Sequence, residues 1–90
     1  MNTRFTVNEE VNITAVYFKN KKTLRSFPRR MEYKNQEYVF IEGLQYLVQK
    51  GQRAVRLFDM TDGDNKFRLK FDDEQFIWTL ISISPEPRSV

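Results

Sequence analysis

The stretch from Ala54 to Phe71, AVRLFDMTDGDNKFRLKF, restricts the fold more than any other part of this chain. In its second half, apolar residues alternate with cations. The apolar ones are Phe67, Leu69 and Phe71, and the cations are Lys66, Arg68 and Lys70. A period of two predicts a β-strand with one apolar and one cationic face. The residues Asp62-Gly63-Asp64-Asn65 are typical of a tight turn, so the stretch is expected to form a β-hairpin.

The same alternation recurs along the chain and predicts six strands in all. They cover residues 4–18, 23–34 and 37–48, the two arms of the hairpin, and residues 76–84. Glu9 interrupts the apolar row of the first segment, which predicts a bend or a break near Asn8–Glu10. Pro28 lacks a backbone donor, so the second strand is expected to be an edge strand or to bend there. Asn35–Gln36 is expected to form a two-residue hairpin turn.

Two segments leave alternatives open. Gly43 is interpreted as a bulge that lets the third strand continue through Leu44, Tyr46 and Val48. The same residues also fit one short helix, but a strand suits the neighbouring segments better. Phe76–Ser84 is apolar on both faces, which is typical of a central, doubly covered strand or of a buried oligomer edge.

These strands predict one all-β domain over residues 1–84, followed by a flexible tail over residues 85–90. A flat meander of six antiparallel strands would leave its apolar face exposed. Curling into an SH3-like or similar small barrel covers that face and removes open edges. A sheet completed by dimerisation is the alternative.

The composition excludes several classes of chemistry. The chain has no Cys and no His, so thiolate nucleophiles, imidazole ligands and Ser-His-Asp triads are ruled out. Asp59, Asp62 and Asp64 do not have the spacing of an EF-hand, and they are interpreted as turn residues. We therefore expect no enzyme, no catalytic residues, no metal, no cofactor and no small-molecule substrate.

The chain also lacks features of secreted and membrane proteins. Its first residues, MNTRFTVNEE, contain no apolar signal core, and no segment approaches the ~20 apolar residues of a membrane-spanning helix. Disulfides, which often stabilise small secreted domains, are impossible without Cys. We expect a cytoplasmic protein with no membrane partner.

Charge is unevenly distributed along the chain. Residues 1–36 hold eight Lys or Arg and three Glu, a charge of +5, whereas residues 37–90 hold seven Lys or Arg and nine Asp or Glu, a charge of −2. The basic excess is concentrated in the second predicted strand and the turn before it. Arginine suits phosphate recognition, and aromatic rings stack on bases. The expected nucleic-acid contacts are Arg25, Arg29, Arg30, Lys34 and Tyr33.

A family resemblance rests on three short motifs. The segment Pro28–Tyr38, PRRMEYKNQEY, resembles an opening of the form P-R-R-hydrophobic-x-W/Y-x-G-R-x-Y, with Asn35 in place of the usual Gly. Phe67–Leu69 and Trp78–Ile83 resemble the later Y-E-L and W-x-L-x-x-V segments of that family. It is a small bacterial domain family of unknown function, sometimes associated with Y-family DNA polymerases. The resemblance implies a β fold and a connection with DNA.

Together these observations predict a small binding module whose partner is DNA or RNA. The alternative is a protein-interaction adaptor or a homo-oligomeric domain, using the apolar strand Phe76–Ile83 as an edge. In that case the basic strand is a solvated face and its aromatic residues belong to the core.

Overall fold

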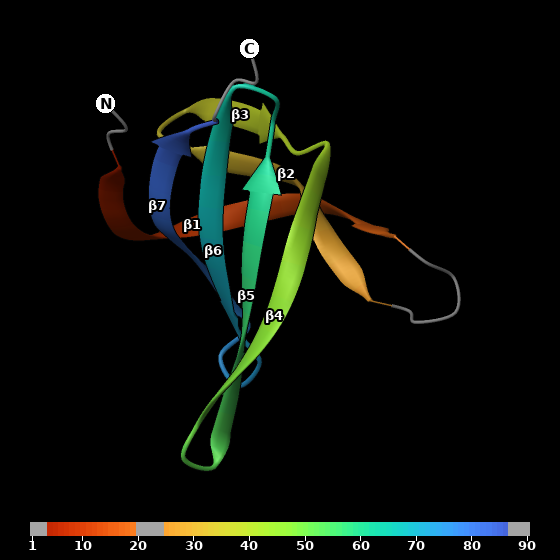
Figure 1. Ribbon diagram of the computed structural model, residues 1–90, viewed down its shortest axis with the longest axis vertical. Helices are drawn as coiled ribbons and strands as arrows, with labels where there is room; N and C mark the ends of the chain where they lie inside the picture. Colours follow the sequence, from red (N-terminus) through yellow and green to blue (C-terminus); the bar gives the residue numbers. More distant parts are fainter. Residues whose placement is uncertain (1–3, 20–24, 87–90) are drawn as a thin grey trace.

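The computed structural model describes residues 4–19 and 25–86, and these residues form one antiparallel sheet of seven strands (Figure 1). The strands are β1 (Phe5–Phe18), β2 (Ser26–Tyr33), β3 (Gln36–Val39), β4 (Glu42–Lys50), β5 (Arg53–Thr61), β6 (Asn65–Asp72) and β7 (Ile77–Pro85). The all-β prediction is confirmed, and the strand interpretation of the segment after Gly43 is correct. Residues 20–22 of the predicted turn, residues 23–24 of the second predicted strand and residues 87–90 of the predicted tail lie outside the described residues.

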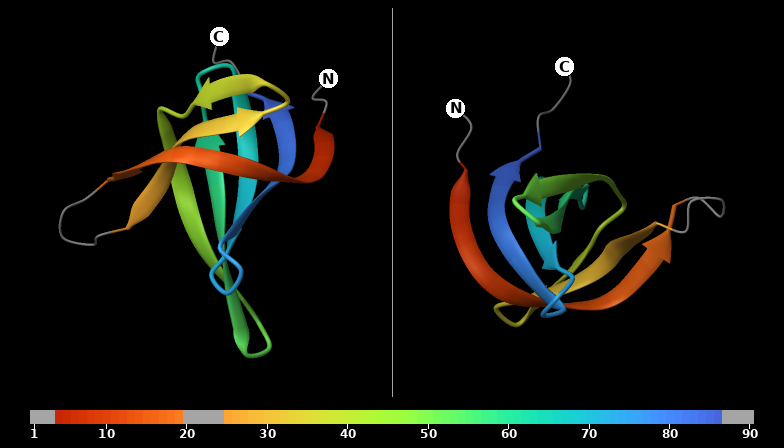
Figure 2. Two further views of the ribbon diagram at one scale, coloured as in Figure 1. Left: turned by 180° about the vertical axis from the view of Figure 1, so that it is seen from behind. Right: turned by 90° about the horizontal axis from the view of Figure 1, so that it is seen from below.

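The strand order is β3-β2-β1-β7-β6-β5-β4. Each strand therefore pairs with the next one along the chain, except that β3 does not pair with β4, and β1 pairs with β7. The sheet is strongly curled (Figure 2). It does not close into a hydrogen-bonded barrel, because the described strands leave β3 and β4 as its two edges.

The third predicted strand is two strands, which explains the count of seven. The chain crosses from β2 to β5 at Phe40–Ile41: the Phe40 N–H donates to the Arg29 carbonyl at 2.7 Å, and the Ile41 N–H donates to the Thr61 carbonyl at 2.9 Å. Phe40 is fully buried. Gly43 is not a bulge, because it pairs with Met60 in the unbroken β4–β5 ladder.

The first hairpin turn lies one residue earlier than predicted. Lys34 and Asn35 have φ angles of 51° and 61°, and Tyr33 pairs with Gln36 across them. Two consecutive positive φ angles are those of a type I′ turn, which matches the right-handed twist of the flanking strands. The prediction of Asn35–Gln36 was wrong because it assigned the tolerant Asn to the first rather than the second turn position.

The expected irregularities in β1 and β2 are present. Asn8 has a φ of 52°, and the β1–β7 register shifts between Thr6 and Glu9. Pro28 pairs with Val16 of β1, whereas β3 begins its pairing with β2 only at Arg30. β2 is therefore an internal strand, but at Pro28 no β3 residue is paired with it, so the missing N–H of Pro28 leaves no β2–β3 hydrogen bond unmade.

The hydrophobic core fills the concave side of the curled sheet. Residues from five of the strands and the β3–β4 link contribute buried side chains to it. They are Val11, Phe27, Met31, Phe40, Phe58, Met60, Phe67, Leu69 and Leu80. β7 lies between β1 and β6, so the central-strand interpretation of residues 76–84 is correct. Its use as an exposed interaction edge is excluded by those two neighbours.

Side chains rather than a strand ladder connect β4 to the opposite side of the sheet. Lys19 Nζ donates to the Gly43 carbonyl at 3.1 Å, and Gln45 Nε2 donates to the Ser26 carbonyl at 2.8 Å. Arg29 Nη1 donates to the Phe40 carbonyl at 2.8 Å. We call this region, between β4 and the adjacent ends of β1 and β2, the seam.

Candidate nucleic-acid interface

The basic residues of the molecule fall into two groups. Within residues 4–19 and 25–86, the ion pairs involve Arg53, Arg56 and Arg68, and none includes a cation of β1, β2 or their flanking residues. All three paired arginines lie on β5 or β6. Among the described residues, six cations without an ion pair lie between Arg4 and Lys34, and three more, Lys50, Lys66 and Lys70, lie on β4 and β6.

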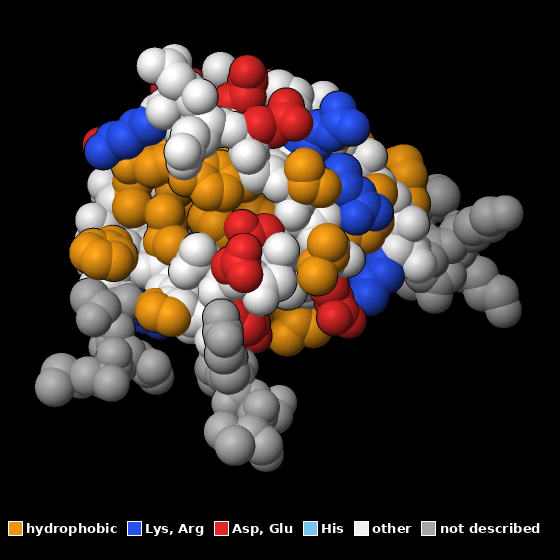
Figure 3. All heavy atoms as spheres, turned by 90° about the horizontal axis from the view of Figure 1, so that it is seen from above, with side chains coloured by type: hydrophobic (Ala, Val, Ile, Leu, Met, Phe, Trp, Pro, Cys, Tyr) orange, Lys and Arg blue, Asp and Glu red, His pale blue; other side chains and the backbone are white. Residues whose placement is uncertain are grey.

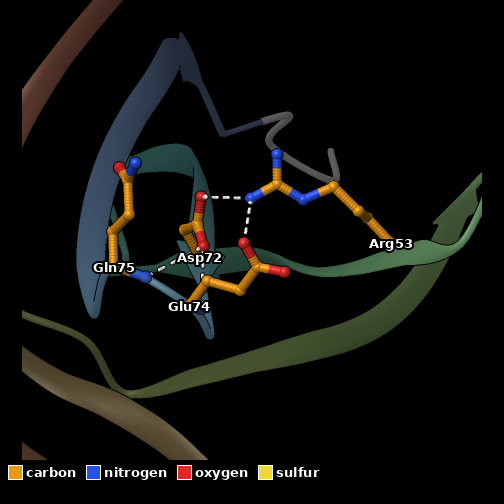
Figure 4. A network of polar contacts seen from close by, with 4 residues as sticks. All are labelled: Arg53, Asp72, Glu74 and Gln75. Atoms are coloured by element: carbon orange, nitrogen blue, oxygen red, sulfur yellow. Dashed lines mark hydrogen bonds and ion pairs between the residues drawn. The ribbon is translucent and has the colours of Figure 1, made fainter.

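The β4–β5 turn and the β6–β7 turn are joined by a polar network (Figure 4). Arg53 Nη2 lies 2.6 Å from Glu74 Oε2 and 3.9 Å from Asp72 Oδ2. Asp72 Oδ1 accepts the backbone N–H groups of Glu74 and Gln75 at 2.9 and 3.2 Å. These two N–H groups lower the pKa of Asp72, so its charge is kept beside Arg53. The charge of Arg53 is thus largely neutralised by Glu74 and Asp72.

A second pair neutralises Arg68, one of the three cations on the cationic face of the central hairpin; Lys66 and Lys70 form no ion pair within the described residues. Arg68 Nε and Nη2 donate to the two Asp59 carboxylate oxygens at 2.7 and 2.9 Å. The hydrogen bonds from Arg68 lower the pKa of Asp59 and outweigh the effect of its partial burial. Because the folded pKa is lowered, the pair stabilises the protein above the ordinary Asp pKa and loses this effect as the pH falls through the folded value.

Of the predicted contacts, Arg29 has a structural role as well as a charge. Its guanidinium carbon lies 3.9 Å from the centroid of the Tyr17 ring, in addition to its bond to the Phe40 carbonyl. Burial raises the pKa of Tyr17, and the Arg29 charge opposes that effect. Arg29 is half-buried. It holds the seam together and presents only part of its guanidinium to solvent.

The remaining predicted residues do not form one patch. Arg25 and Arg30 are exposed near the seam, whereas Tyr33 and Lys34 lie at the β2–β3 turn. Lys34 lies nine positions after Arg25 along extended chain, about 30 Å at ~3.3 Å per residue. Lys34 Nζ lies 5.3 Å from the Tyr33 ring centroid. This end of the sheet is also rich in carboxylates, with Glu9, Glu10 and Glu32 lining the same hollow as Tyr33 and Lys34.

The residues that do come together lie at the other end of β1 and β2. Phe18 pairs with Ser26 in the β1–β2 ladder, so Lys19 and Arg25 flank the last pair of the ladder from the two strands. The Phe18 side chain is 59% exposed. Arg30 lies further along β2, where it pairs with Ala15. We call Phe18, Lys19, Arg25, Arg29 and Arg30 the basic end.

Sequence reasoning did not group Phe18 and Lys19 with the predicted contacts. Val16 and Phe18 gave β1 apolar residues on its second face, which indicated burial on both sides, but both side chains are more than half exposed. A signal was present in the sequence: an aromatic residue directly before a run of lysines. From above the molecule, Lys and Arg side chains follow one flank with hydrophobic side chains between them (Figure 3).

Comparison of the chain with protein-family models, with curated proteins and with solved structures gave no match. Within the described residues, no helix has the length and apolarity needed to cross a membrane. The same residues contain no group of three or more acidic side chains arranged to hold a metal ion. The functional proposal therefore rests on the geometry and charge of the basic end.

Proposed function

We propose that this protein binds DNA or RNA through the basic end. The observation that supports this most is the division of charge: carboxylates neutralise the arginines of β5 and β6, whereas no described carboxylate forms an ion pair with Lys19, Arg25 or Arg30. Ion-paired arginines gain less binding free energy from a phosphate, because their ion pair with a carboxylate must first be broken. Unpaired cations release only counterions when they bind a phosphate.

The basic end combines two kinds of contact that single-stranded nucleic acid uses. Arg25 and Arg30 offer exposed guanidinium groups, which can donate two parallel hydrogen bonds to one phosphate. The exposed Phe18 ring offers a stacking surface for a base, and such stacking contributes about 1–3 kcal/mol per base. We favour a single strand over a duplex because its bases are free to stack on an exposed ring.

The fold supports the proposal at the level of architecture. We infer that the sheet is a small barrel left open along the seam, since side chains bridge the two strands that a ladder would otherwise join. Small barrels commonly bind oligonucleotides through charge and aromatic residues on one face. The Arg29 contacts with Tyr17 and Phe40 fix the seam and so fix the positions of the neighbouring cations.

A salt-titrated binding assay tests the proposal. For single strands, log K falls with log salt concentration by about 0.7 per phosphate contact. Replacing both Arg25 and Arg30 with alanine is expected to weaken binding of a labelled oligonucleotide and to reduce this slope by about 1.4. Fluorescence anisotropy at several salt concentrations measures both quantities.

The matched control is the Arg53→Ala, Arg56→Ala double variant. It removes the same charge from the molecule, but from arginines that pair with Glu74 and Asp73. The control should keep both the affinity and the slope. Equal losses in the two variants would show that net charge alone drives binding, and an unchanged affinity in the Arg25, Arg30 variant would refute the proposed site.

A further inference from the structure

The edge strand β4 lacks the features that normally protect a sheet edge from pairing with another chain. It has nine residues and pairs with β5 without a register shift. It contains no proline, and its charged residues, Glu42 and Lys50, stand at its two ends. The opposite edge, β3, has only four residues and carries Glu37 inside the strand. Long, regular edges without internal charges are prone to strand addition.

Exposed apolar side chains lie on both faces of β4. Leu44 and Tyr46 are 57% and 42% exposed on the outer face, and Leu47 is 69% exposed on the inner face. Tyr46 pairs with Leu57 on β5, which extends the apolar surface inward from the edge. A ligand that covers one face of β4 would leave the apolar side chains of the other face exposed to solvent. A strand added to the edge extends both faces of the sheet.

The backbone of β4 is oriented for such an addition. Lys50 pairs with Arg53 across the two-residue turn Gly51–Gln52, and residues that flank a two-residue turn exchange hydrogen bonds with each other. By the antiparallel alternation, Leu47 and Gln49 then direct their N–H and C=O groups away from β5. The Lys19 bond to the Gly43 carbonyl fits this alternation.

We propose that β4 pairs antiparallel with β4 of a second copy of this chain, with the two-fold axis at Leu47. In this register Tyr46 lies opposite Val48 of the second copy, and Leu47 lies opposite its own equivalent. Lys50 lies diagonal to Glu42 of the second copy, within reach of its long side chain. At the centre of the pairing apolar residues face apolar residues, and at each end Lys50 lies opposite Leu44 and diagonal to Glu42. A surface that is complementary to itself forms a closed dimer.

The shape of the molecule leaves room for this pairing. The β4–β5 hairpin projects beyond the other strands (Figure 1), so the outer edge of β4 is open towards its tip. The seam contacts reach β4 at Gly43 and Gln45 only. The pairing from Gln45 to Gln49 uses the Gln45 backbone, while the Gln45 side chain keeps its bond to Ser26.

A charge-exchange experiment at the two-fold axis tests the dimer. Leu47→Lys places two lysines opposite each other, and Leu47→Glu does the same with two glutamates. Each variant alone is expected to raise the dimer dissociation constant by at least about tenfold, because like charges oppose each other at the centre of the interface. An equimolar mixture is expected to form a heterodimer. Sedimentation equilibrium measures all three dissociation constants.

Phe76→Lys is the matched control, because Phe76 is an exposed apolar residue, 78% accessible, on the β6–β7 turn and outside the proposed β4 pairing. It should leave the dimer intact. Three results would overturn the proposal: a wild-type protein that stays monomeric at millimolar concentration, a dimer that survives both Leu47 variants, or a mixture that fails to associate. Circular dichroism of each variant separates loss of pairing from loss of folding.

Discussion

Replacing Phe67 with alanine is expected to lower the free energy of unfolding by about 3–5 kcal/mol. Phe67 is 1% exposed. Its ring centroid lies 5.2 Å from that of Tyr38 and 5.1 Å from that of Phe40. Because Tyr38 and Phe40 belong to β3 and the β3–β4 link, Phe67 packs β6 across the core against the other end of the sheet. A domain of this size has a total stability of about 5–15 kcal/mol, so the variant should be largely unfolded or close to it.

Urea denaturation followed by tryptophan fluorescence measures this loss, since Trp78 lies in the same core. Phe76→Ala is the control, because it removes the same atoms from an exposed ring. The control should change the free energy of unfolding by less than about 1 kcal/mol. Similar losses in the two variants would contradict the assignment of the core.

Gly43→Ala is expected to destabilise the protein by about 2–3 kcal/mol, a large effect for one methyl group. A Cβ at this position would overlap the Met60 side chain and lie 2.7 Å from the Asp59 carbonyl oxygen. Met60 is 1% exposed and has no space into which to withdraw. The backbone oxygen belongs to the β4–β5 ladder, so relieving the clash requires the two strands to separate locally.

Gly51→Ala provides a comparison in which space plays no part. Gly51 has a φ of 60°, and nothing lies within 4 Å of the position that its Cβ would take. The Gly51→Ala variant should lose only about 1–2 kcal/mol of the free energy of unfolding, the cost of placing a residue with a Cβ in the left-handed backbone conformation. Thermal unfolding of both variants distinguishes the two effects. If Gly51→Ala were the more damaging change, close packing around Gly43 would not be the reason for that glycine.

Short-range patterns explain why most of the fold was predictable. Side-chain alternation located the strands, and the Asp62–Asn65 turn formed as expected: Asp62 Oδ1 accepts the N–H groups of Asp64 and Asn65 at 2.9 Å each. Both features depend on residues within a few positions of each other. The same is true of the bend at Asn8, where a break in the apolar row marks a real irregularity.

Features set by distant residues could not be predicted. The split between β3 and β4 depends on hydrogen bonds to Arg29 and Thr61. Glu42 interrupts the apolar row of Tyr38, Phe40 and Leu44, but the interruption alone does not distinguish a bulge from two strands. The need for Gly43 arises from Met60, on the neighbouring strand. Which strands lie at the edges follows from the pairing of β1 with β7, which is a long-range contact.

The candidate site shows the same limit. Sequence analysis located the basic strand, but a count of charges cannot tell which arginines meet a partner inside the protein. Arg68 donates from Nε and Nη2 to Asp59, nine residues earlier, whereas Arg25 and Arg30 are exposed. Lys34 was grouped with them by position in the chain, and the extended strand β2 separates it from Arg25.

The most direct test of the account is a backbone amide NMR titration of the ¹⁵N-labelled protein with a short single-stranded oligonucleotide. The division of charge predicts that resonances of Phe18, Lys19, Arg25 and Arg30 shift most, with little change at Arg53 and Arg68. These two sets lie on different strands and are readily distinguished. Shifts centred on β5 and β6, or no shifts at low salt, would contradict the proposal that the basic end is where this protein meets nucleic acid.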